Sequence, residues 1–171
     1  MSSPTNNCGK ETTDLLTLAN NILEQTTSIV KYLKDNNLAP PTFAADSTEP
    51  PETAKYLALH GSLKTSLDDL DRLIDGPKRS LRSFVCQGND LAAFQVACDF
   101  EFFNLVPVEG EISIVDLAQK AGLDVDRVAR VLRMLATRRI FSEATPGFIS
   151  HTAASYAIGN DEELRCAGHY M

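Results

Sequence analysis

SIVDLAQKAGLDVDRVARVLRMLATRRIFSEATPGFISHT (residues 113–152) is the most regularly patterned stretch of this 171-residue chain. Apolar residues recur at three- and four-residue steps over 114–121 and again over about 125–137, which predicts two short amphipathic helices separated by Gly122. Apolar and polar residues then alternate on both sides of the turn sequence at 144–147, as in a β-hairpin. Two helices at an angle followed by a hairpin predict a winged helix.

Residues that commonly cap helices stand at the predicted boundaries. Ser113 and the acidic residue three positions later resemble a capping box, and Asp124 is a typical N-cap for the second helix. Thr152 can cap one further helix, predicted at 153–158. Ile112, just before the helical pair, is expected to form a short strand.

The segment at 90–106, DLAAFQVACDFEFFNLV, is predicted to be the most apolar helix of the chain. Only Gln95 and Asp99 form a clear polar strip on it. A helix that is apolar almost all round is covered on several sides, so we expect this one at the centre of the core and partly at a subunit interface. The preceding residues 87–89 predict a break, with Asn89 as the N-cap.

Helical periodicity also marks the first half of the chain. Residues 13–36 predict an amphipathic helix, and residues 37–51, with four prolines, predict a linker. A second helix is expected at 52–74, where Asp-Gly-Pro at 75–77 would end it. A short third helix follows at 77–86.

The predicted fold class is mainly α: a winged helix, meaning a helix-turn-helix plus a β-hairpin, with an N-terminal helical arm. The residues expected in the core are the apolar ones on the inner faces of the predicted helices and strands. They are Leu91, Phe94, Phe102, Leu117, Val128, Val131, Leu132, Leu135, Ile140 and Phe148.

The charge distribution bears on nucleic acid, which many winged helices bind. A net charge of −7 means that the chain as a whole repels phosphate backbones. Arg127, Arg130 and Arg133 nevertheless lie three residues apart along one flank of the second helix, as they would in a DNA reader. The hairpin tip at 143–147 has no lysine or arginine that could contact phosphate, so nucleic acid is not the expected partner.

No catalytic, cofactor-binding or metal-ligating residue is predicted. His60, His151 and His169 lie far apart, and none has a carboxylate or nucleophile in a recognisable arrangement. The four cysteines form no C-x-x-C pair, and no two glycines are separated by a single residue, as a G-x-G phosphate loop requires. Neither a secretion signal nor an apolar run of roughly 20 residues is found, which favours the cytoplasm and no membrane partner.

Three segments, in this order, resemble the N-terminal dimerisation domain of fungal, plant-type small-molecule O-methyltransferases that use S-adenosylmethionine. The first is NDLAAFQVACDFEFFNLVP at 89–107, a helix ending in an aromatic-rich stretch and a proline. The second is SIVDLAQKAGLDVDRVARVLRMLATRRIF at 113–141, which is similar to the winged helix of the family. The third is FISHTAASYAI at 148–158, which resembles the His-Thr-x-x-Ser that follows the wing. The upstream helix and its proline-bearing linker resemble the fungal branch.

The resemblance implies a division of the chain and an incomplete enzyme. In the family, S-adenosylmethionine and the catalytic histidine belong to a Rossmann-like domain that follows the winged helix, and none of those residues has a match in this chain. The chain is therefore expected to bind no cofactor and to be catalytically incomplete alone. The implied parts are an N-terminal arm (1–36), a linker (37–51), a winged-helix dimerisation domain (52–160) and the start of a connection to a catalytic domain (161–171).

The resemblance also implies an intertwined homodimer of fungal secondary metabolism, in which helices of one subunit help wall the substrate pocket of the other. An aromatic or polyketide-like small molecule is the ligand expected at the dimer interface. Two alternatives stay open: a winged-helix DNA-binding transcription regulator, and a non-methylating, pericyclase-like relative or stand-alone interaction protein. The predicted interface residues are apolar residues of the first and the aromatic-rich helices: Ile22, Ile29, Phe94, Phe100 and Phe103.

Overall fold

The structure, a computed structural model, describes residues 14–161, 163 and 164. Within these residues the contacts form two compact units, one made of residues 14–39 and 51–80 and the other of residues 40–50 and the described residues from 81 onward. A single kinked helix, α2 (Ala54–Asp99), contributes to both units. Each unit has its own cluster of buried apolar side chains.

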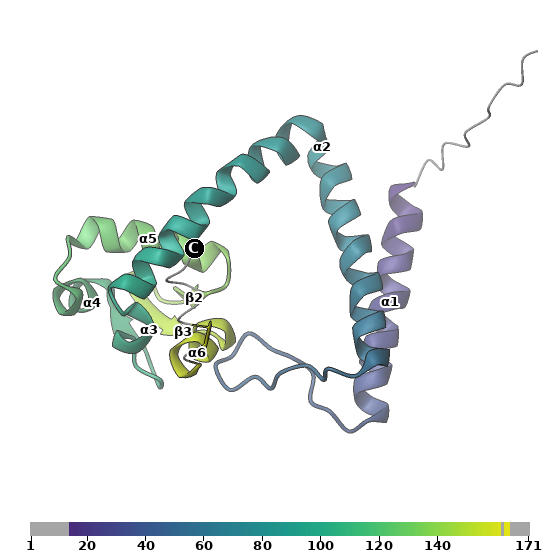
Figure 1. Ribbon diagram of the computed structural model, residues 1–171, viewed down its shortest axis with the longest axis horizontal. Helices are drawn as coiled ribbons and strands as arrows, with labels where there is room; N and C mark the ends of the chain where they lie inside the picture. Colours follow the sequence, from purple (N-terminus) through teal and green to yellow (C-terminus); the bar gives the residue numbers. More distant parts are fainter. Residues whose placement is uncertain (1–13, 162, 165–171) are drawn as a thin grey trace, which may run out of the picture. The chain divides into compact units, whose positions relative to one another are not determined.

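The first unit consists of α1 (Leu15–Asp35) alongside the first half of α2 (Figure 1). Tyr32, Leu33 and Tyr56 form its buried cluster, and the centroids of the two tyrosine rings lie 5.8 Å apart. The Tyr32 hydroxyl lies 2.7 Å from Thr53 Oγ1, which also accepts a hydrogen bond from the Tyr56 amide. The amphipathic helix predicted at 13–36 is confirmed, and its apolar face packs on α2.

Helix α2 changes direction at Gly76, whose φ of 67° and ψ of 169° are not helical. Glycine reaches this conformation without a steric penalty, whereas a residue with a Cβ does not. The next residue, Pro77, has no N–H to donate to the helix. The helix end predicted at 75–77 is therefore a kink, after which the helix continues.

The interruption predicted at 87–89 is wrong, because α2 stays helical through Gly88 to its end. A glycine inside a helix costs about 1 kcal/mol relative to alanine. The following turns bury Ala93, Ala97 and Cys98 in the core of the second unit, and this packing outweighs that cost. Asn89 consequently lies in mid-helix and caps nothing.

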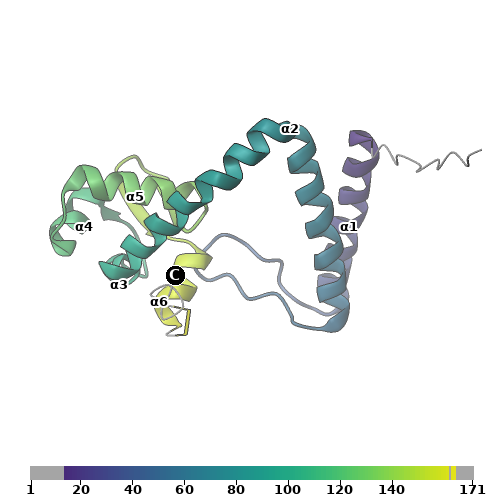
Figure 2. The same ribbon diagram turned by 45° about the horizontal axis from the view of Figure 1, so that its top comes forward.

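The second unit joins the rest of α2 to short helices and a small sheet (Figures 1 and 2). Its further elements are α3 (Phe102–Leu105), β1 (Ile112–Ser113), α4 (Ile114–Ala121), α5 (Val125–Thr137), β2 (Phe141–Ser142), β3 (Phe148–His151) and α6 (Ala153–Asn160). The strand order is β1-β3-β2 with antiparallel pairing, which places Ile112 opposite Ile149 and Phe141 opposite His151. Helix α4 packs on α5 and α3, and α3 also packs on α6. The fold is thus mainly helical with one small antiparallel sheet.

The predicted signals for helix ends are confirmed around α4 and α5. The Ser113 hydroxyl accepts a hydrogen bond from the Asp116 amide at 3.0 Å, and Asp124 Oδ1 accepts one from the Arg127 amide at 3.1 Å. Gly122 ends α4 with a φ of 67°, the left-handed conformation of a helix C-cap. Both helices therefore begin and end at the predicted residues.

The core of the second unit contains most of the apolar residues expected there. Phe102, Leu117, Val128, Leu132 and Leu135 are buried, and Phe94, Val131 and Ile140 are half-buried. Two predictions are wrong, since Leu91 is 53% exposed and Phe148 is 40% exposed. Ala93 and Ala97 face the core from α2, which turns Leu91 to the other side of the helix. In β3 it is Ile149 that faces the core, so its neighbour Phe148 points outward.

Part of the proline-rich segment belongs to the second unit. The carbonyl of Phe43 accepts a hydrogen bond from the Ala153 amide at 3.0 Å, at the start of α6. The Arg139 guanidinium lies 5.4 Å from the centroid of the Phe43 ring. Residues 40–50 therefore contact the body of this unit and are more than a bare connection.

Candidate binding groove

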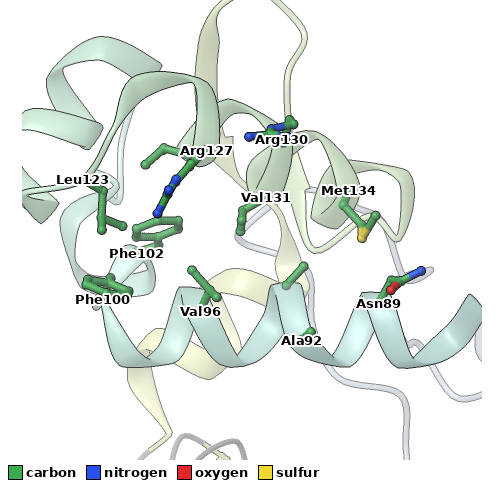
Figure 3. Close-up of a pocket in the computed structure, with 12 residues that line it drawn as sticks. Asn89, Ala92, Val96, Phe100, Phe102, Leu123, Arg127, Arg130, Val131 and Met134 are labelled. Carbon is green, nitrogen blue, oxygen red and sulfur yellow. The ribbon is translucent and has the colours of Figure 1, made fainter.

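An open groove of about 570 Å³ lies between the second half of α2 and α5 (Figure 3). Alanine, valine, leucine, methionine and phenylalanine side chains make up most of its wall. The lining residues, all in the second unit, are Asn89, Ala92, Ala93, Val96, Phe100, Phe102, Leu123, Arg127, Val128, Arg130, Val131 and Met134.

The spacing of apolar residues on the two helices explains why a groove forms there. On α5, Leu132 is buried in the core, Val128 is buried and also lines the groove, and the half-buried Val131 lines it as well. On α2 the small side chains of Ala92 and Ala93 leave space between this helix and α5. These small side chains leave a recess between the two helices, and larger apolar side chains of both helices line it.

Aromatic side chains occupy one end of the groove. Phe102 is completely buried and forms part of the wall, whereas Phe100 is 40% exposed at the rim. Phe103 lies in the core behind them, with its ring 5.1 Å from Phe141 and 5.6 Å from Phe94, measured between centroids. This end of the groove is therefore supported by a rigid aromatic cluster.

Two arginines of α5 add positive charge to the apolar groove. The Arg127 side chain points from α5 toward the Phe102 ring (Figure 3). Arg130 also lines the groove, and its Nε donates to the carbonyl of Asp126 at 3.4 Å. Asn89 and Met134 lie at the other end (Figure 3). The groove is thus apolar along its floor and positively charged along one edge.

The neighbouring arginines are engaged in ion pairs within the second unit. Arg133 pairs with Glu143 of the hairpin, with 3.2 Å between Nε and Oε2. Arg138 pairs with Asp90 of α2. The row of positive charge expected from the sequence is therefore partly neutralised by carboxylates of the same chain.

The predicted interface residues are divided between the two units. Ile22 and Ile29 are half-buried in the first unit, where Ile29 packs against the tyrosine cluster. In the second unit Phe100 lines the groove and Phe94 is half-buried, whereas Phe103 is only 4% exposed. Whether these residues contact a partner stays a prediction.

Sequence reasoning missed the exposed apolar residues near the middle of α2. Leu81, Phe84 and Val85 are 64%, 68% and 71% exposed, on the stretch of α2 that leads to the groove. Their three- and four-residue spacing is the signal that could have identified them as one helix face. In the first unit Leu16 and Leu23 of α1 are similarly exposed, at 73% and 66%.

His151 acts as a structural residue in this fold. Its Nε2 lies 3.1 Å from the carbonyl of Val106, and its Nδ1 lies 2.9 Å from Ser155 Oγ. Because a carbonyl can only accept, Nε2 carries the proton and Nδ1 accepts from the serine. Burial lowers the pKa of His151 below its ordinary value, and the hydrogen bond to Val106 opposes that shift. The ring therefore ties β3 to the end of α3 and to α6.

The described residues lack the features of a metal site and of a Rossmann-type cofactor site. Among them, no group of three or more histidine, cysteine, aspartate or glutamate side chains is arranged to hold a metal ion. Their strands are two to four residues long and antiparallel, whereas a nucleoside cofactor site of the Rossmann type needs parallel strands joined to helices by glycine-rich turns. S-adenosylmethionine therefore does not fit this part of the chain. Over the same residues, none of the helices combines the length and the apolar character needed to span a bilayer.

Comparison with known proteins shows the family to which this chain belongs. Residues 89–158, which include every residue that lines the groove, match the profile of the O-methyltransferase dimerisation domain. Over 157 residues, 92% of this chain, the sequence is 59% identical to O-methyltransferase sol2 of Alternaria solani. This chain carries the dimerisation domain of the fungal O-methyltransferases. A second relative, the chlorophenol O-methyltransferase of Trichoderma longibrachiatum, is 28% identical over 92% of the chain.

Solved structures agree with the O-methyltransferase fold. The crystal structure of OxaC superimposes on 92% of this chain with a TM-score of 0.71 at 13% identity, so the likeness concerns the fold alone. OxaC has also been solved in complex with SAH and oxaline, and that structure gives a TM-score of 0.58. The chain spans 37% of the length of sol2 and 35% of OxaC, or about a third of each.

Proposed function

We propose that this chain is the homodimer-forming part of an S-adenosylmethionine-dependent O-methyltransferase of fungal secondary metabolism. In this proposal, methyl transfer requires a Rossmann-like domain in addition to these 171 residues. The observation that carries the proposal is the coincidence of the dimerisation profile, at 89–158, with the segment that lines the apolar groove. The relatives are roughly two and a half times as long as this chain, which supports the need for a further domain.

The exposed apolar surface of the chain supports self-association. Monomeric soluble proteins rarely expose large contiguous apolar patches, because such patches drive association. In this chain the groove and the exposed face that leads to it, with Leu81, Phe84 and Val85, lie on the same helix. A partner that covers this surface would gain roughly 25 cal/mol for each Å² of apolar area removed from water.

The pair α4–α5 followed by the β2–β3 hairpin supports the winged-helix interpretation, which we include in the proposal. We propose that this winged helix joins protein chains and does not read DNA. Arg133 and Arg138 are paired with Glu143 and Asp90, so two of the five arginines near α5 already have carboxylate partners. Releasing them to contact phosphate would leave those carboxylates next to a polyanion.

A small aromatic or polyketide-like molecule at the dimer interface completes the proposal. The aromatic wall formed by Phe100 and Phe102 supports this class of ligand, because planar rings pack well against one another. One relative is named for chlorophenol, and OxaC was crystallised with oxaline. We propose that the domain contributes apolar wall to such a pocket, while the catalytic groups lie elsewhere in the full enzyme.

A chimera tests the proposal. The matching segment of O-methyltransferase sol2 is replaced by the corresponding 157 residues of this chain. We expect a folded dimer that transfers methyl groups from S-adenosylmethionine to the substrate of sol2. In calorimetry, the isolated chain should give no heat with S-adenosylmethionine. A chimera that folds but stays monomeric, or cofactor binding by the isolated chain, would contradict the proposal.

Binding to duplex DNA distinguishes the winged-helix regulator from the dimerisation domain. We expect no change in the fluorescence anisotropy of a labelled duplex at low salt, because few cationic groups are available for phosphate. Affinity that falls steeply as salt is raised would instead identify a DNA-binding protein.

A further inference from the structure

We propose that the groove between α2 and α5 binds an aromatic molecule that carries one carboxylate, and that Arg127 and Arg130 bind this carboxylate. The inference deepens the proposed function and rests on the part of it that assigns a small aromatic ligand to this surface. It adds the charge of the ligand and the residues that recognise it. The exposed face of α2 with Leu81, Phe84 and Val85 stays available to a second copy.

The groove differs in charge from the chain as a whole, whose net charge is −7. Among the described residues that line the groove there are two arginines and no aspartate or glutamate. Asp90, which follows the lining residue Asn89 in the sequence, is paired with Arg138. A cleft that is lined by one sign of charge and has apolar walls concentrates its field on a ligand of the opposite charge. The groove therefore complements an anion that has an apolar body.

The guanidinium groups of Arg127 and Arg130 are available to such an anion. Neither takes part in an ion pair within the part of the chain that the structure describes, whereas Arg133 and Arg138 both do. Arg130 Nε donates to the Asp126 carbonyl at 3.4 Å, so its terminal nitrogens can still donate to a ligand. A guanidinium presents its N–H donors in a planar fork that matches the two oxygens of a carboxylate.

The direction of the Arg127 side chain indicates where the carboxylate would lie. This side chain points from α5 toward the Phe102 ring, at the aromatic end of the groove (Figure 3). Phe100 forms the rim at the same end. An anion bound by Arg127 is therefore close to two rings, against which a further ring packs well. This arrangement favours a carboxylate attached directly to an aromatic ring over one at the end of a long aliphatic chain.

The remainder of the groove fits the apolar body of the ligand. Val96 and Val131 line it beyond the aromatic end, and Asn89 and Met134 lie at the other end (Figure 3). Eleven residues separate Asn89 from Phe100, which corresponds to about 16 Å along a helix axis. The volume of about 570 Å³ falls within the range of roughly 300–1,000 Å³ that is usual for small-molecule pockets.

A carboxylate fits this groove better than a phosphate does. A phosphate monoester carries nearly two negative charges at neutral pH, and moving a charge from water to apolar surroundings is costly unless it is fully paired. One arginine fork pairs with both oxygens of one carboxylate. Two arginines beside apolar walls are therefore suited to a single negative charge.

Two probes that share a ring system and differ in charge test the proposal. Naphthoate is an anion at neutral pH, and naphthamide, with its group at the same ring position, is neutral. In isothermal titration calorimetry with the 171-residue chain, we expect a Kd for naphthoate about tenfold lower than that for naphthamide, because hydrogen bonds to an ionised group are the stronger ones. Added salt should weaken the binding of naphthoate alone. Equal affinities, or no binding of either probe at millimolar concentration, would overturn the proposal.

Substitution of the two arginines tests which residues bind the anion. The double variant Arg127→Gln, Arg130→Gln should lose the preference for naphthoate and keep its affinity for naphthamide. Arg133→Gln is the matched control, because Arg133 lies on the same helix, pairs with Glu143 and is not among the lining residues. It should keep the preference of about tenfold. A preference that survives in the double variant, or that Arg133→Gln abolishes equally, contradicts the assignment.

Ala92→Leu tests the position of the apolar body. Ala92 is exposed and lines the groove, so a leucine there fills part of the recess without entering the core. We expect both probes to bind about fivefold more weakly or worse, since less apolar surface is left for them to cover. Ala58→Leu makes the same change at an exposed site of α2 in the first unit, and both affinities should stay unchanged. Unchanged binding in Ala92→Leu would show that the probes bind elsewhere, which overturns the proposal.

The outcomes separate this inference from the proposed function. Sedimentation velocity of the same samples gives the assembly state of the chain. A dimer that shows no preference for naphthoate would overturn the ligand assignment, and the dimerisation function would stand. A monomer whose preference for naphthoate depends on Arg127 and Arg130 would support the ligand assignment and contradict the dimerisation function.

Discussion

The carboxylate of Glu143, at the start of the hairpin turn, bonds the guanidinium of Arg133 on α5. Arg133 Nε lies 3.2 Å from Oε2, and Oε1 accepts the Gly147 amide at 2.9 Å. The hydrogen bond from Arg133, and after it that from Gly147, holds the pKa of Glu143 below its ordinary value. One side chain therefore closes the turn and fixes the hairpin to α5.

Replacing Glu143 by glutamine should destabilise the second unit mildly and in a pH-dependent way. We expect a loss of about 1 kcal/mol of unfolding free energy at neutral pH, a limit set by the exposure of the pair. Because the folded pKa lies below the unfolded one, the contribution of the carboxylate is complete above its ordinary pKa and is lost as the pH falls through the folded value. Urea unfolding between about pH 3 and pH 7, at one protein concentration, should show the two proteins converging in acid. A difference that grows in acid would contradict this role.

Thr152 should matter more, because its hydroxyl is buried. Oγ1 lies 2.9 Å from the Arg139 carbonyl and 2.8 Å from the Ile140 carbonyl, and it caps α6. Thr152→Val keeps the volume and removes the hydroxyl, so it takes a buried donor away from two backbone carbonyls and the cap from α6, and we expect a loss of about 1–3 kcal/mol. Thr152→Ser, which keeps the hydroxyl, is the matched control and should lose clearly less. Equal losses would show that the hydroxyl is unimportant.

Substitutions at two residues of α4, one buried and one exposed, test which face of that helix packs against the core. Leu117 is fully buried, so Leu117→Ala should cost about 2–5 kcal/mol. Val115 is 58% exposed, and Val115→Ala should change the stability by less than about 0.5 kcal/mol. Chemical denaturation of both variants measures the contrast. Similar losses would mean that α4 packs in another orientation.

Gly76 and Gly61 provide a matched pair within α2. Gly76 has a φ of 67°, so Gly76→Ala forces a side chain into a strained conformation and should destabilise the first unit by about 1 kcal/mol or more. Gly61 lies in a helical stretch with nothing within 4 Å of an added Cβ. Gly61→Ala should therefore stabilise the helix by up to about 1 kcal/mol. Thermal melts that follow the helical circular dichroism signal distinguish the two, and stabilisation by both substitutions would contradict the kink.

Local signals in the sequence predicted the second unit well. The caps at Ser113, Asp124 and Thr152 and the left-handed Gly122 act over three or four residues, so the bounds of α4 and α5 and the start of α6 could be read directly. The order of helix, helix and hairpin followed from the same short-range patterns. These features depend on hydrogen bonds between near neighbours in the chain.

Features that depend on packing were not predictable in the same way. Gly88 and Asn89 look like a break, yet later turns of α2 are anchored in the core and keep the helix continuous. The groove arises where α2 meets α5, more than 20 residues further along the chain, so no single segment encodes it. The difference between Arg127, which points toward Phe102, and Arg133, which pairs with the hairpin, likewise appears only in three dimensions.

Sedimentation equilibrium of the 171-residue chain tests most directly whether two copies associate. We expect a mass that approaches twice the 18.7 kDa of one chain as the concentration rises through the micromolar range. A mass that stays at that of one chain up to about 100 μM would correspond to an association weaker than about 5 kcal/mol. That result would contradict a dimerisation function for the groove and for the helix that borders it.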